Sequence, residues 1–448
     1  MHKPMSHQEL LSQVKKDEVR LVSLQFTDVI GTLKSVNILP DRLSEALETG
    51  VWFDGSSIQG FTRIFESDMV LHPDPSTYLV LPWTAETGKV ARLLCDVHTP
   101  AGDPFPSDPR GILRATQARA AKLGYTYMTG AEIEFFLFKT ENGPATQPIP
   151  FDLGSYFDSS QGDMAAQIRR EMMFALAEMG INVQAAHHEV APGQHEINVQ
   201  YGDALSSADC TITLKYTIKA IAQKFGVYAT FMPKPIRGIN GSGMHTHQSF
   251  MDSKGGNAFY DPVDKYHLSQ VAYQFMAGQL AHARGLSAIV APTVNSYKRL
   301  VPGYEAPAYV CWGQINRSAL IRIPMVSKGQ EKATRAELRC PDPSCNPYLA
   351  FAAMLAAGLD GIDKGMTPPG PTEENVFEFD YSQLEQANIQ MMPGSLAEAL
   401  DEFRKDEVIQ TALGEHVCRW FIRAKTKEWD AYRLQVTPWE LERYLATT

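Results

Sequence analysis

The sequence predicts an α+β protein with two domains. Its 448 residues are enough to bury a large core and to divide into two or more domains. The composition changes near residue 100, where the stretch from Asp96 to Arg110 is rich in Pro, Asp and Gly and predicts a linker. Beyond it, helical stretches alternate with strand-like segments, so the smaller first part and the larger second part are both expected to be α+β.

The individual elements follow from local patterns. Residues 6–18 predict a short amphipathic helix, and Val19 to Phe26 and Leu79 to Trp83 predict strands, because branched and aromatic residues gather there between turns. In the larger part, apolar residues at helical spacing predict helices over about 108–123, 162–180, 207–226, 264–285, 346–363 and 395–406.

Composition excludes several classes of protein. A net charge of −10, with acidic residues spread along the chain, argues against a nucleic-acid binder. The polar N-terminus does not resemble a signal peptide, and no stretch approaches the roughly 18 apolar residues that cross a bilayer, so a cytoplasmic location is expected. Six cysteines without CxxC spacing predict reduced structural thiols: Cys95, Cys210, Cys311, Cys340, Cys345 and Cys418.

Two glutamates stand in the apolar stretch from Ala131 to Phe138, which predicts a strand. The period of two along a strand puts Glu132 and Glu134 on the same face, where their charges repel. A solvent-exposed strand face is the plain interpretation of one such pair. It becomes less convincing when further carboxylates of the same kind are found.

A second pair, Glu189 and Glu196, flanks the turn signal at residues 192–193. A hairpin centred there pairs these two glutamates across from each other, roughly 5 Å apart. With His245 and Glu337, which also stand in apolar or glycine-rich stretches, they require a compensating positive charge. Oxygen ligands with one imidazole suit Mg²⁺ or Mn²⁺ better than metals that prefer thiolates, so the sequence predicts a divalent metal cluster.

Five arginines in the C-terminal half form a second group. The planar guanidinium suits carboxylates and phosphates, so arginines near a metal cluster predict an anionic, phosphorylated substrate; surface ion pairs are the alternative. Nearby, the loop from Asn240 to His245 contains glycines that let the backbone approach a ligand closely. The five arginines are Arg299, Arg317, Arg322, Arg335 and Arg339.

Several longer motifs resemble the signatures of type I glutamine synthetases, and the likeness runs from about residue 15 to the C-terminus. The resemblance implies an N-terminal β-grasp domain over residues 15–100. It also implies a catalytic domain over residues 106–448, with an antiparallel half-barrel sheet flanked by helices. The implied reaction is ATP-dependent ligation of ammonia to L-glutamate through γ-glutamyl phosphate. The motifs are Asp54 to Ser57, Lys234 to His245, Asn295 to Pro307, Asn316-Arg317 and Arg335 to Arg339.

The same resemblance assigns roles, with ATP as co-substrate and two or more Mg²⁺ or Mn²⁺ ions in each site. Metals and arginines would neutralise the charge that develops as the phosphoryl group moves. The metal that protects the glutamate site is assigned to Glu134, Glu189 and Glu196, and the nucleotide-side metal to Glu132, His245 and Glu337. Arg317 and Arg322 are assigned to the ATP phosphates and the transferring phosphoryl group, and Arg317 and Arg339 count among the catalytic residues. Substrate contacts are assigned to Asn240, Gly241, His245, Arg299 and Arg339, and other nucleotide contacts to His247, Ser249, Lys332 and Arg335. The segment 325–334 is longer than expected for the alpha subdivision of the family.

In the family, ammonium binding and deprotonation fall to the residue matching Asp54, in a pocket with Ser57 and Glu305. Glu305 is also assigned to the flap that shields the acyl phosphate from water. Without the resemblance, Asp54-Gly55 would predict only a turn. Because Asp54 lies in the small domain, the resemblance implies active sites shared between neighbouring subunits, in a dodecamer of two stacked hexameric rings.

The resemblance also bears on regulation. In the beta subdivision a tyrosine is adenylylated, but Phe377 stands at the matching position and has no hydroxyl, which predicts the alpha subdivision. Arg63 matches an arginine involved in feedback inhibition by glutamine; the alternative is an ion pair with Glu66 or Asp68. A regulatory protein is a possible further partner. Two alternative functions stand beside this one: a ligase of glutamate to polyamines or other amines, and an inactive structural or nitrogen-sensing relative.

Overall fold

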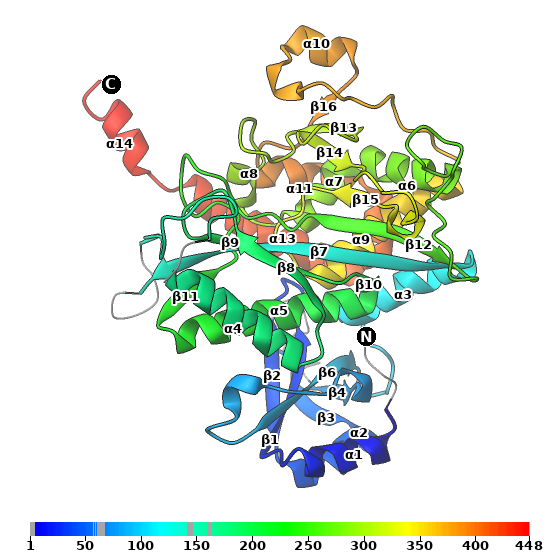
Figure 1. Cartoon of the computed structure of the whole chain (residues 1–448), viewed down its shortest axis with the longest axis vertical. Helices are drawn as coiled ribbons and strands as arrows, with labels where there is room; N and C mark the ends of the chain where they lie inside the picture. Colours follow the sequence, from blue (N-terminus) through cyan, green and yellow to red (C-terminus); the bar gives the residue numbers. More distant parts are fainter. Residues whose placement is uncertain are drawn as a thin grey trace.

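The structure is a computed structural model of the chain, and it describes residues 5–56, 58, 60, 68–140, 147–159 and 163–447. Ser57 and Arg63, to which roles were assigned from the sequence, lie outside the described residues. A small N-terminal lobe lies below a larger lobe, and the two are joined where β6 (Val90–His98) leads into α3 (Pro109–Lys122) (Figure 1).

The N-terminal lobe packs two helices against a mixed sheet, as expected for a β-grasp domain. The sheet has the order β2-β1-β6-β4-β3, with β5 beside β6, and β1 runs parallel to β6 while the other pairs are antiparallel. Ser6 begins the first helix through a capping box with Glu9. The elements are α1 (His7–Lys16), β1 (Leu21–Thr27), β2 (Leu33–Ile38), α2 (Leu43–Thr49), β3 (Val51–Asp54), β4 (Asp68–Pro73), β5 (Leu79–Val80) and β6 (Val90–His98).

The larger lobe is built on a ten-stranded half-barrel sheet with the order β16-β13-β14-β15-β12-β7-β9-β8, and β10 and β11 also pair with β7. Its pairs are antiparallel except for β13 and β14, which are parallel. The strands are β7 (Tyr125–Lys139), β8 (Val183–His188), β9 (Gln194–Val199), β10 (Gly202–Asp203), β11 (Val227–Thr230), β12 (Thr246–Asp252), β13 (Tyr309–Gly313), β14 (Ala319–Arg322), β15 (Ala336–Leu338) and β16 (Gln390–Met391).

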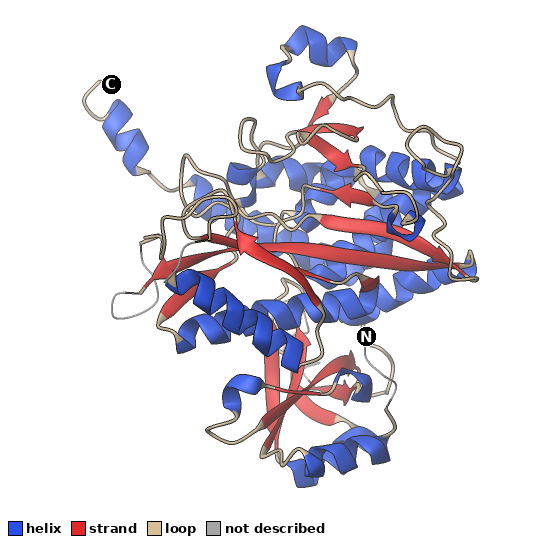
Figure 2. Ribbon diagram, in the orientation of Figure 1, coloured by secondary structure: helices blue, strands red, loops and turns tan. Residues whose placement is uncertain are grey.

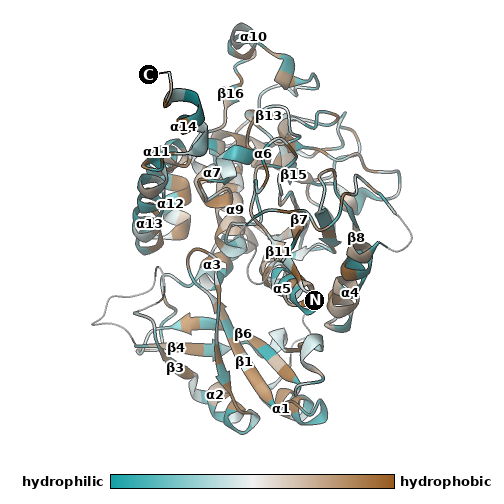
Figure 3. Cartoon of the chain, turned by 90° about the vertical axis from the view of Figure 1, so that its left-hand side faces the viewer, coloured by the Kyte–Doolittle hydropathy of each residue, from teal (hydrophilic) through white to brown (hydrophobic). Residues whose placement is uncertain are grey.

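Helices cover one side of this sheet, with α3 and α5 against β7 and α4 against β8 (Figure 2). Helix α9 is buried along almost its whole length and packs against α3, α6, α7 and α12. The outer helices turn hydrophilic residues toward solvent (Figure 3). The helices are α3 (Pro109–Lys122), α4 (Met164–Glu178), α5 (Ala204–Lys224), α6 (Gln270–Ala281), α7 (Ala283–Val290), α8 (Ser296–Arg299), α9 (Pro347–Asp363), α10 (Tyr381–Gln386), α11 (Leu396–Lys405), α12 (Glu407–Leu413), α13 (Glu415–Arg433) and α14 (Pro438–Tyr444).

Two predicted elements differ from the structure. The strand expected over residues 79–83 stops after Val80, because Pro82 lacks an N–H for a ladder and opens a 3-10 turn. The helix expected over residues 264–285 is two helices that meet at His282, whose imidazole contacts Asp360 and Asp406 of neighbouring elements. Within the described ranges, no helix combines the length and apolarity that a bilayer crossing needs.

The segment from Asp96 to Arg110 is a rigid joint rather than a free linker. The buried Arg110 guanidinium bonds Asp74 and Asp96 of the small lobe at 2.8 Å each and Asp209 of α5 at 2.9 and 3.0 Å. Burial alone would raise the pKa values of Asp74 and Asp96, but Arg110, helped by Ser76 at Asp74 and by Arg114 at Asp96, lowers both pKa values. One cation therefore ties both lobes together.

Removing that cation should destabilise the protein strongly. In an Arg110→Met variant Asp74 and Asp209 lose the cation that pairs with them and Asp96 keeps only Arg114, so the free energy of unfolding should fall by about 3–5 kcal/mol. Arg114→Met is the matched control, because Arg114 is half exposed and, among the residues that the structure describes, forms an ion pair with Asp96 alone, so about 1 kcal/mol or less is expected. Denaturant unfolding of both variants would measure this; equal losses would contradict the central role of Arg110.

Candidate functional site

The pairing of strands in the large sheet brings the predicted metal ligands to one face. Glu134 of β7 lies opposite Glu196 of β9, and Glu196 lies opposite His187 of β8. On the other side of β7, the N–H of Glu132 donates to the carbonyl of His245 at 3.0 Å, and β12 continues the sheet to β15 and Glu337. Because residues two apart on a strand share a face, these side chains form two neighbouring groups.

The first group is Glu132, His245 and Glu337, whose ligand atoms lie within 4.8 Å of one another. His245 Nδ1 is 3.2 Å from Glu132 and 3.9 Å from Glu337. Arg339 Nη1 donates to Glu337 Oε1 at 2.5 Å. Burial would raise the pKa of Glu337, but Arg339 and the nearby histidines lower it. Glu337 Oε2 is buried and accepts no hydrogen bond from the described residues, and Arg322 Nε lies 3.1 Å away from it.

The second group differs from its predicted form. Glu189 and Glu196 come together with His187, within 4.8 Å, while Glu134 lies on the adjacent strand. The predicted pairing of Glu189 with Glu196 is wrong: Glu189 pairs with Gln194, and Glu196 faces His187. The loop between the paired residues has four residues, 190–193, rather than two, and this shifts the register.

Charge in the second group is poorly compensated in the absence of a cation. Burial, together with repulsion from Glu196 and Glu189, raises the pKa of Glu134 well above its usual value, although Arg299 opposes this. Burial and the neighbouring Glu196 raise the pKa of Glu189 to about 7. Clustered carboxylates that repel one another and a buried carboxylate oxygen without a hydrogen bond are what a divalent cation would satisfy, so the donor set fits the implied metal.

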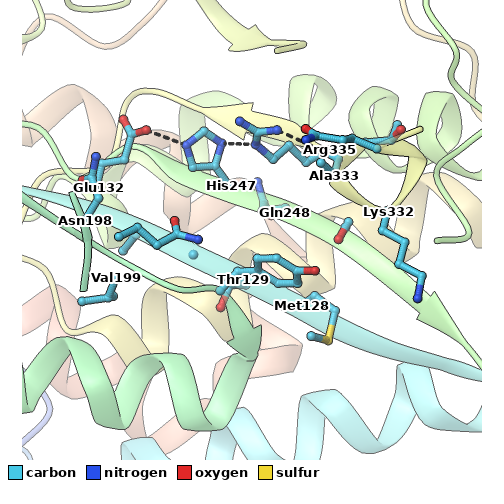
Figure 4. Close-up of a pocket in the computed structure, with 17 residues that line it drawn as sticks. Met128, Thr129, Glu132, Asn198, Val199, His247, Gln248, Lys332, Ala333 and Arg335 are labelled. Carbon is cyan, nitrogen blue, oxygen red and sulfur yellow. Dashed lines mark hydrogen bonds and ion pairs between the residues drawn. The ribbon is translucent and has the colours of Figure 1, made fainter. Parts of the chain in front are cut away.

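A cavity of about 330 Å³ lies beside the first group. His247 Nδ1 accepts from Arg335 Nε at 3.1 Å, so its Nε2 carries the proton and donates to Glu132 at 2.7 Å (Figure 4). Arg335 also donates to the carbonyl of Ala333. All four residues assigned to other nucleotide contacts line this cavity: His247, Ser249, Lys332 and Arg335.

Arg299, which was assigned to glutamate binding, is almost completely buried. It donates to the backbone carbonyls of Arg339, Cys340 and Pro341 at 3.0 to 3.2 Å. A Cβ on Gly243 would lie 2.5 Å from Arg299 Nη2, so only glycine leaves room for the guanidinium. In this structure Arg299 braces the backbone that carries Arg339.

Glu305 and Arg317 lie together at the exposed edge of the site. Their side chains are 3.8 Å apart and more than half exposed. The backbone of Glu305 has a positive φ of 50°, which is strained for a residue with a side chain. Arg339 Nη2 donates to its carbonyl at 3.2 Å. The loop is therefore held at its backbone while its carboxylate remains open to solvent.

The glycine-rich loop approaches the second group. Gln194 Nε2 bridges Glu134 and the carbonyl of Gly241 at 3.0 Å each. A Cβ on Gly241 would lie 2.2 Å from the Pro233 carbonyl, so this close approach requires glycine. Asn240, assigned to glutamate, is half-buried in the same loop.

Asp54 is not brought to either group within the chain. It ends β3 in the lower lobe and is exposed, and it accepts from the Ser56 N–H at 2.8 Å. Hydrogen bonding to the Ser56 side chain and to this N–H lowers the pKa of Asp54. The metal-ligand candidates lie in the upper lobe, on β7, β9 and β15, in the loop after β8 and directly before β12 (Figure 1).

Two site residues were not identified from the sequence. The first is His187, which lies 3.5 Å from Glu189 and 3.4 Å from Glu196. The sequence offered a signal for it, because two consecutive histidines directly precede Glu189. The ring of Tyr156 packs edge-on against His187 with centroids 5.6 Å apart. Burial and the nearby Glu189 raise its pKa. Nothing in the sequence around Tyr156 indicates this position, because a separate loop carries it.

Family models of known proteins match both lobes of the structure. The family model described as "Glutamine synthetase, beta-Grasp domain" matches residues 18–100, and "Glutamine synthetase, catalytic domain" matches residues 106–444. The glutamine synthetase of Methanosarcina mazei is 50% identical over 448 residues, covering 100% of this chain and 99% of that protein. That of Thermus thermophilus is 52% identical over 445 residues, covering 98% of each.

Solved structures give the same result. A GmaS/ADP complex superposes with a TM-score of 0.88 at 32% identity and covers 100% of both chains. The glutamine synthetase of Plasmodium falciparum superposes with a TM-score of 0.87 at 27% identity, covering 98% of this chain and 99% of that one. The chain belongs to the glutamine synthetase family.

Proposed function

We propose that this protein is a glutamate–ammonia ligase that uses ATP to form γ-glutamyl phosphate, which ammonia converts to L-glutamine. The observation that carries the proposal is the pair of carboxylate and histidine groups on one sheet face, beside a cavity lined by His247, Lys332 and Arg335. The sequence identity of about 50% to glutamine synthetases over the full chain supports the same activity.

Two divalent cations, Mg²⁺ or Mn²⁺, fit the two groups. Glu132, His245 and Glu337 would hold the one nearer the nucleotide cavity. Glu189 and Glu196, with Glu134 from the adjacent strand, would hold the other, and His187 is a further donor there. When bound, such ions neutralise phosphate charge and polarise the oxygens between which the phosphoryl group moves.

The chain's own residues would do the remaining work. Lys332 and Arg335 line the nucleotide cavity, and Arg317 and Arg322 provide cations for the phosphates. Arg339 lies between Glu337 and the backbone of Glu305, so it can orient glutamate and support the flap together. Glu305, at the exposed edge, is placed to cover the acyl phosphate against water.

Ammonium binding would depend on a neighbouring subunit. Asp54 is exposed on the lower lobe, away from the metal groups of its own chain (Figure 1). A ring assembly, expected to be a dodecamer of two hexamers, would bring Asp54 and Ser57 of one chain to Glu305 and Tyr156 of the next. The domain limits 15–100 and 106–448, a cytoplasmic location and a regulatory protein partner belong to the same proposal.

Phosphate release tests the proposed activity. Release that depends on ATP and glutamate should be strong with ammonium and weak with a panel of larger amines or with no amine. Glu337→Ala should lower turnover on the order of 100-fold or more, because the nucleotide-side cation loses a buried ligand. Glu178→Ala, an exposed change on α4, is the control. Faster release with another amine would favour an amine ligase, and no release at all would favour an inactive relative.

Subunit mixing tests the shared site. Asp54→Ala and Glu337→Ala proteins should each be inactive alone. After subunit exchange at equal amounts, about a quarter of the shared sites would carry neither lesion and activity should partly return. Activity that stays absent, while mass spectrometry shows mixed assemblies, would place Asp54 and Glu337 of one chain in the same site.

Feedback by glutamine tests the proposed assignment to the alpha subdivision of type I. Phe377, which packs near Tyr309, has no hydroxyl that could be adenylylated. Glutamine should inhibit the wild-type enzyme, and Arg63→Ala should raise the half-inhibitory concentration several-fold, because a cation that would contact the product-bound site is lost. Equal inhibition curves would remove Arg63 from this role, and a wild-type enzyme insensitive to glutamine would exclude feedback.

A further inference from the structure

Two buried histidines lie behind the second metal group. His188 and His195 face each other across the β8–β9 hairpin, and each directly precedes a proposed ligand, Glu189 or Glu196. Because successive residues of a strand point to opposite faces, these rings point away from the metal. Both are almost completely buried, with exposed fractions of 1% and 0%.

A single carboxylate binds both rings. Asp152 Oδ1 accepts from His188 Nε2 at 2.5 Å, and Oδ2 accepts from His195 Nε2 at 3.0 Å. Asp152 Oδ1 also accepts from the N–H of Gly193, at the tip of the hairpin, at 3.3 Å. Asp152 therefore holds both legs of the hairpin and its turn from a loop that is remote in sequence.

The bonds continue outward from both histidines. Arg169 of α4 donates to His195 Nδ1 at 2.8 Å, which fixes the proton of that ring on Nε2. His188 Nδ1 donates to the carbonyl of Glu189 at 2.6 Å, so the chain of bonds ends on the backbone of a proposed metal ligand. A Cβ on Gly154 would lie 2.7 Å from the His188 ring, so only glycine lets the loop approach so closely.

We infer that Asp152 is a positioning residue that holds the β8–β9 hairpin in the geometry required for binding the glutamate-side metal, and this inference rests on the proposed function. Repulsion between Glu189 and Glu196, and between both and Glu134, acts to spread these carboxylates apart before a cation arrives. The bonds of Asp152 on the opposite face resist that spreading. Partners of this kind behind metal ligands typically change metal affinity 10- to 100-fold when removed.

The three buried side chains could instead hold a metal themselves, since their ligand atoms also lie within 4.8 Å. The bonds argue against this. Two atoms that each bind one ion at about 2 Å with ordinary ligand angles are themselves about 3 Å apart, whereas His188 Nε2 and Asp152 Oδ1 are 2.5 Å apart, which is the distance of a hydrogen bond. Both carboxylate oxygens of Asp152 are already occupied by N–H donors.

Manganese binding to the full-length protein tests the inference, with free Mn²⁺ counted by electron paramagnetic resonance. Asp152→Asn should lower the affinity for one of the two bound Mn²⁺ ions by about 10- to 100-fold and leave the affinity for the other unchanged. Asp158→Asn is the matched control, because Asp158 is exposed in the same loop and, within the described part of the chain, its carboxylate accepts only from Ser155; it should leave both affinities unchanged. Glu337→Gln should lower the affinity for the other Mn²⁺ ion.

Two further variants separate the inference from the proposed function. Glu189→Gln should lower the affinity for the same Mn²⁺ ion that Asp152→Asn affects. If it changes nothing, the proposed metal site is wrong; if it acts while Asp152→Asn does not, only the inference is overturned. If Asp152→Asn folds poorly, Arg169→Met, at the outer end of the same chain of bonds, should weaken the same ion to a smaller degree.

Hydrogen exchange gives a readout without metal or turnover. In the metal-free protein, amides over residues 183–199 should exchange faster in Asp152→Asn than in wild type, while Asp158→Asn should match wild type. Unchanged hydrogen exchange in Asp152→Asn would overturn the inference that Asp152 holds the hairpin. A third Mn²⁺ ion in wild type that is lost in Asp152→Asn, with the other two unaffected, would overturn it in favour of a metal at Asp152 itself.

Discussion

Repulsion among buried carboxylates on one face of the large sheet is the constraint on which the rest of the site depends. Moving an ionised carboxylate out of water costs several kcal/mol even after a protein relaxes around it. The sheet nevertheless aligns Glu132 and Glu134 on β7 and sets Glu196 across from Glu134. This arrangement is stable only if cations, fixed or bound, lie against it.

The fixed cations are distributed unevenly. Glu337 has Arg339 and Arg322 within 3.1 Å, so its charge is compensated by the chain. Glu134 receives hydrogen bonds from Gly243 and Gln194, but its nearest charged neighbours include two more carboxylates. The first group is therefore organised before any ligand arrives, whereas the second depends on a bound cation and on the buried bonds of Asp152 behind it.

The parts predicted well from sequence are those with a local cause. The strand that carries Glu132 and Glu134, and helices α3, α5 and α9, follow from periodicity and from caps such as Asp108 and Asn346. The predicted register of the β8–β9 hairpin was wrong, because the length of the loop, and not the turn dipeptide alone, decides which residues face each other. The break at His282 depends on Asp360 and Asp406, which are distant in sequence.

The residues of the site likewise divide into those with a local sequence signal and those without one. Carboxylates in apolar stretches could be identified individually, because burial without a partner is unfavourable wherever they lie. The backbone bonds of Arg299, the place of Tyr156 and the bonds of Asp152 depend on loops that meet only in three dimensions. No local pattern indicates them, so they could not have been predicted from the sequence.

Anomalous scattering from Mn²⁺ in crystals of the full-length protein tests the central claim most directly. The account predicts two peaks per chain, one among Glu132, His245 and Glu337 and one among Glu134, Glu189 and Glu196. A single peak, or peaks away from this face of the sheet, would contradict it.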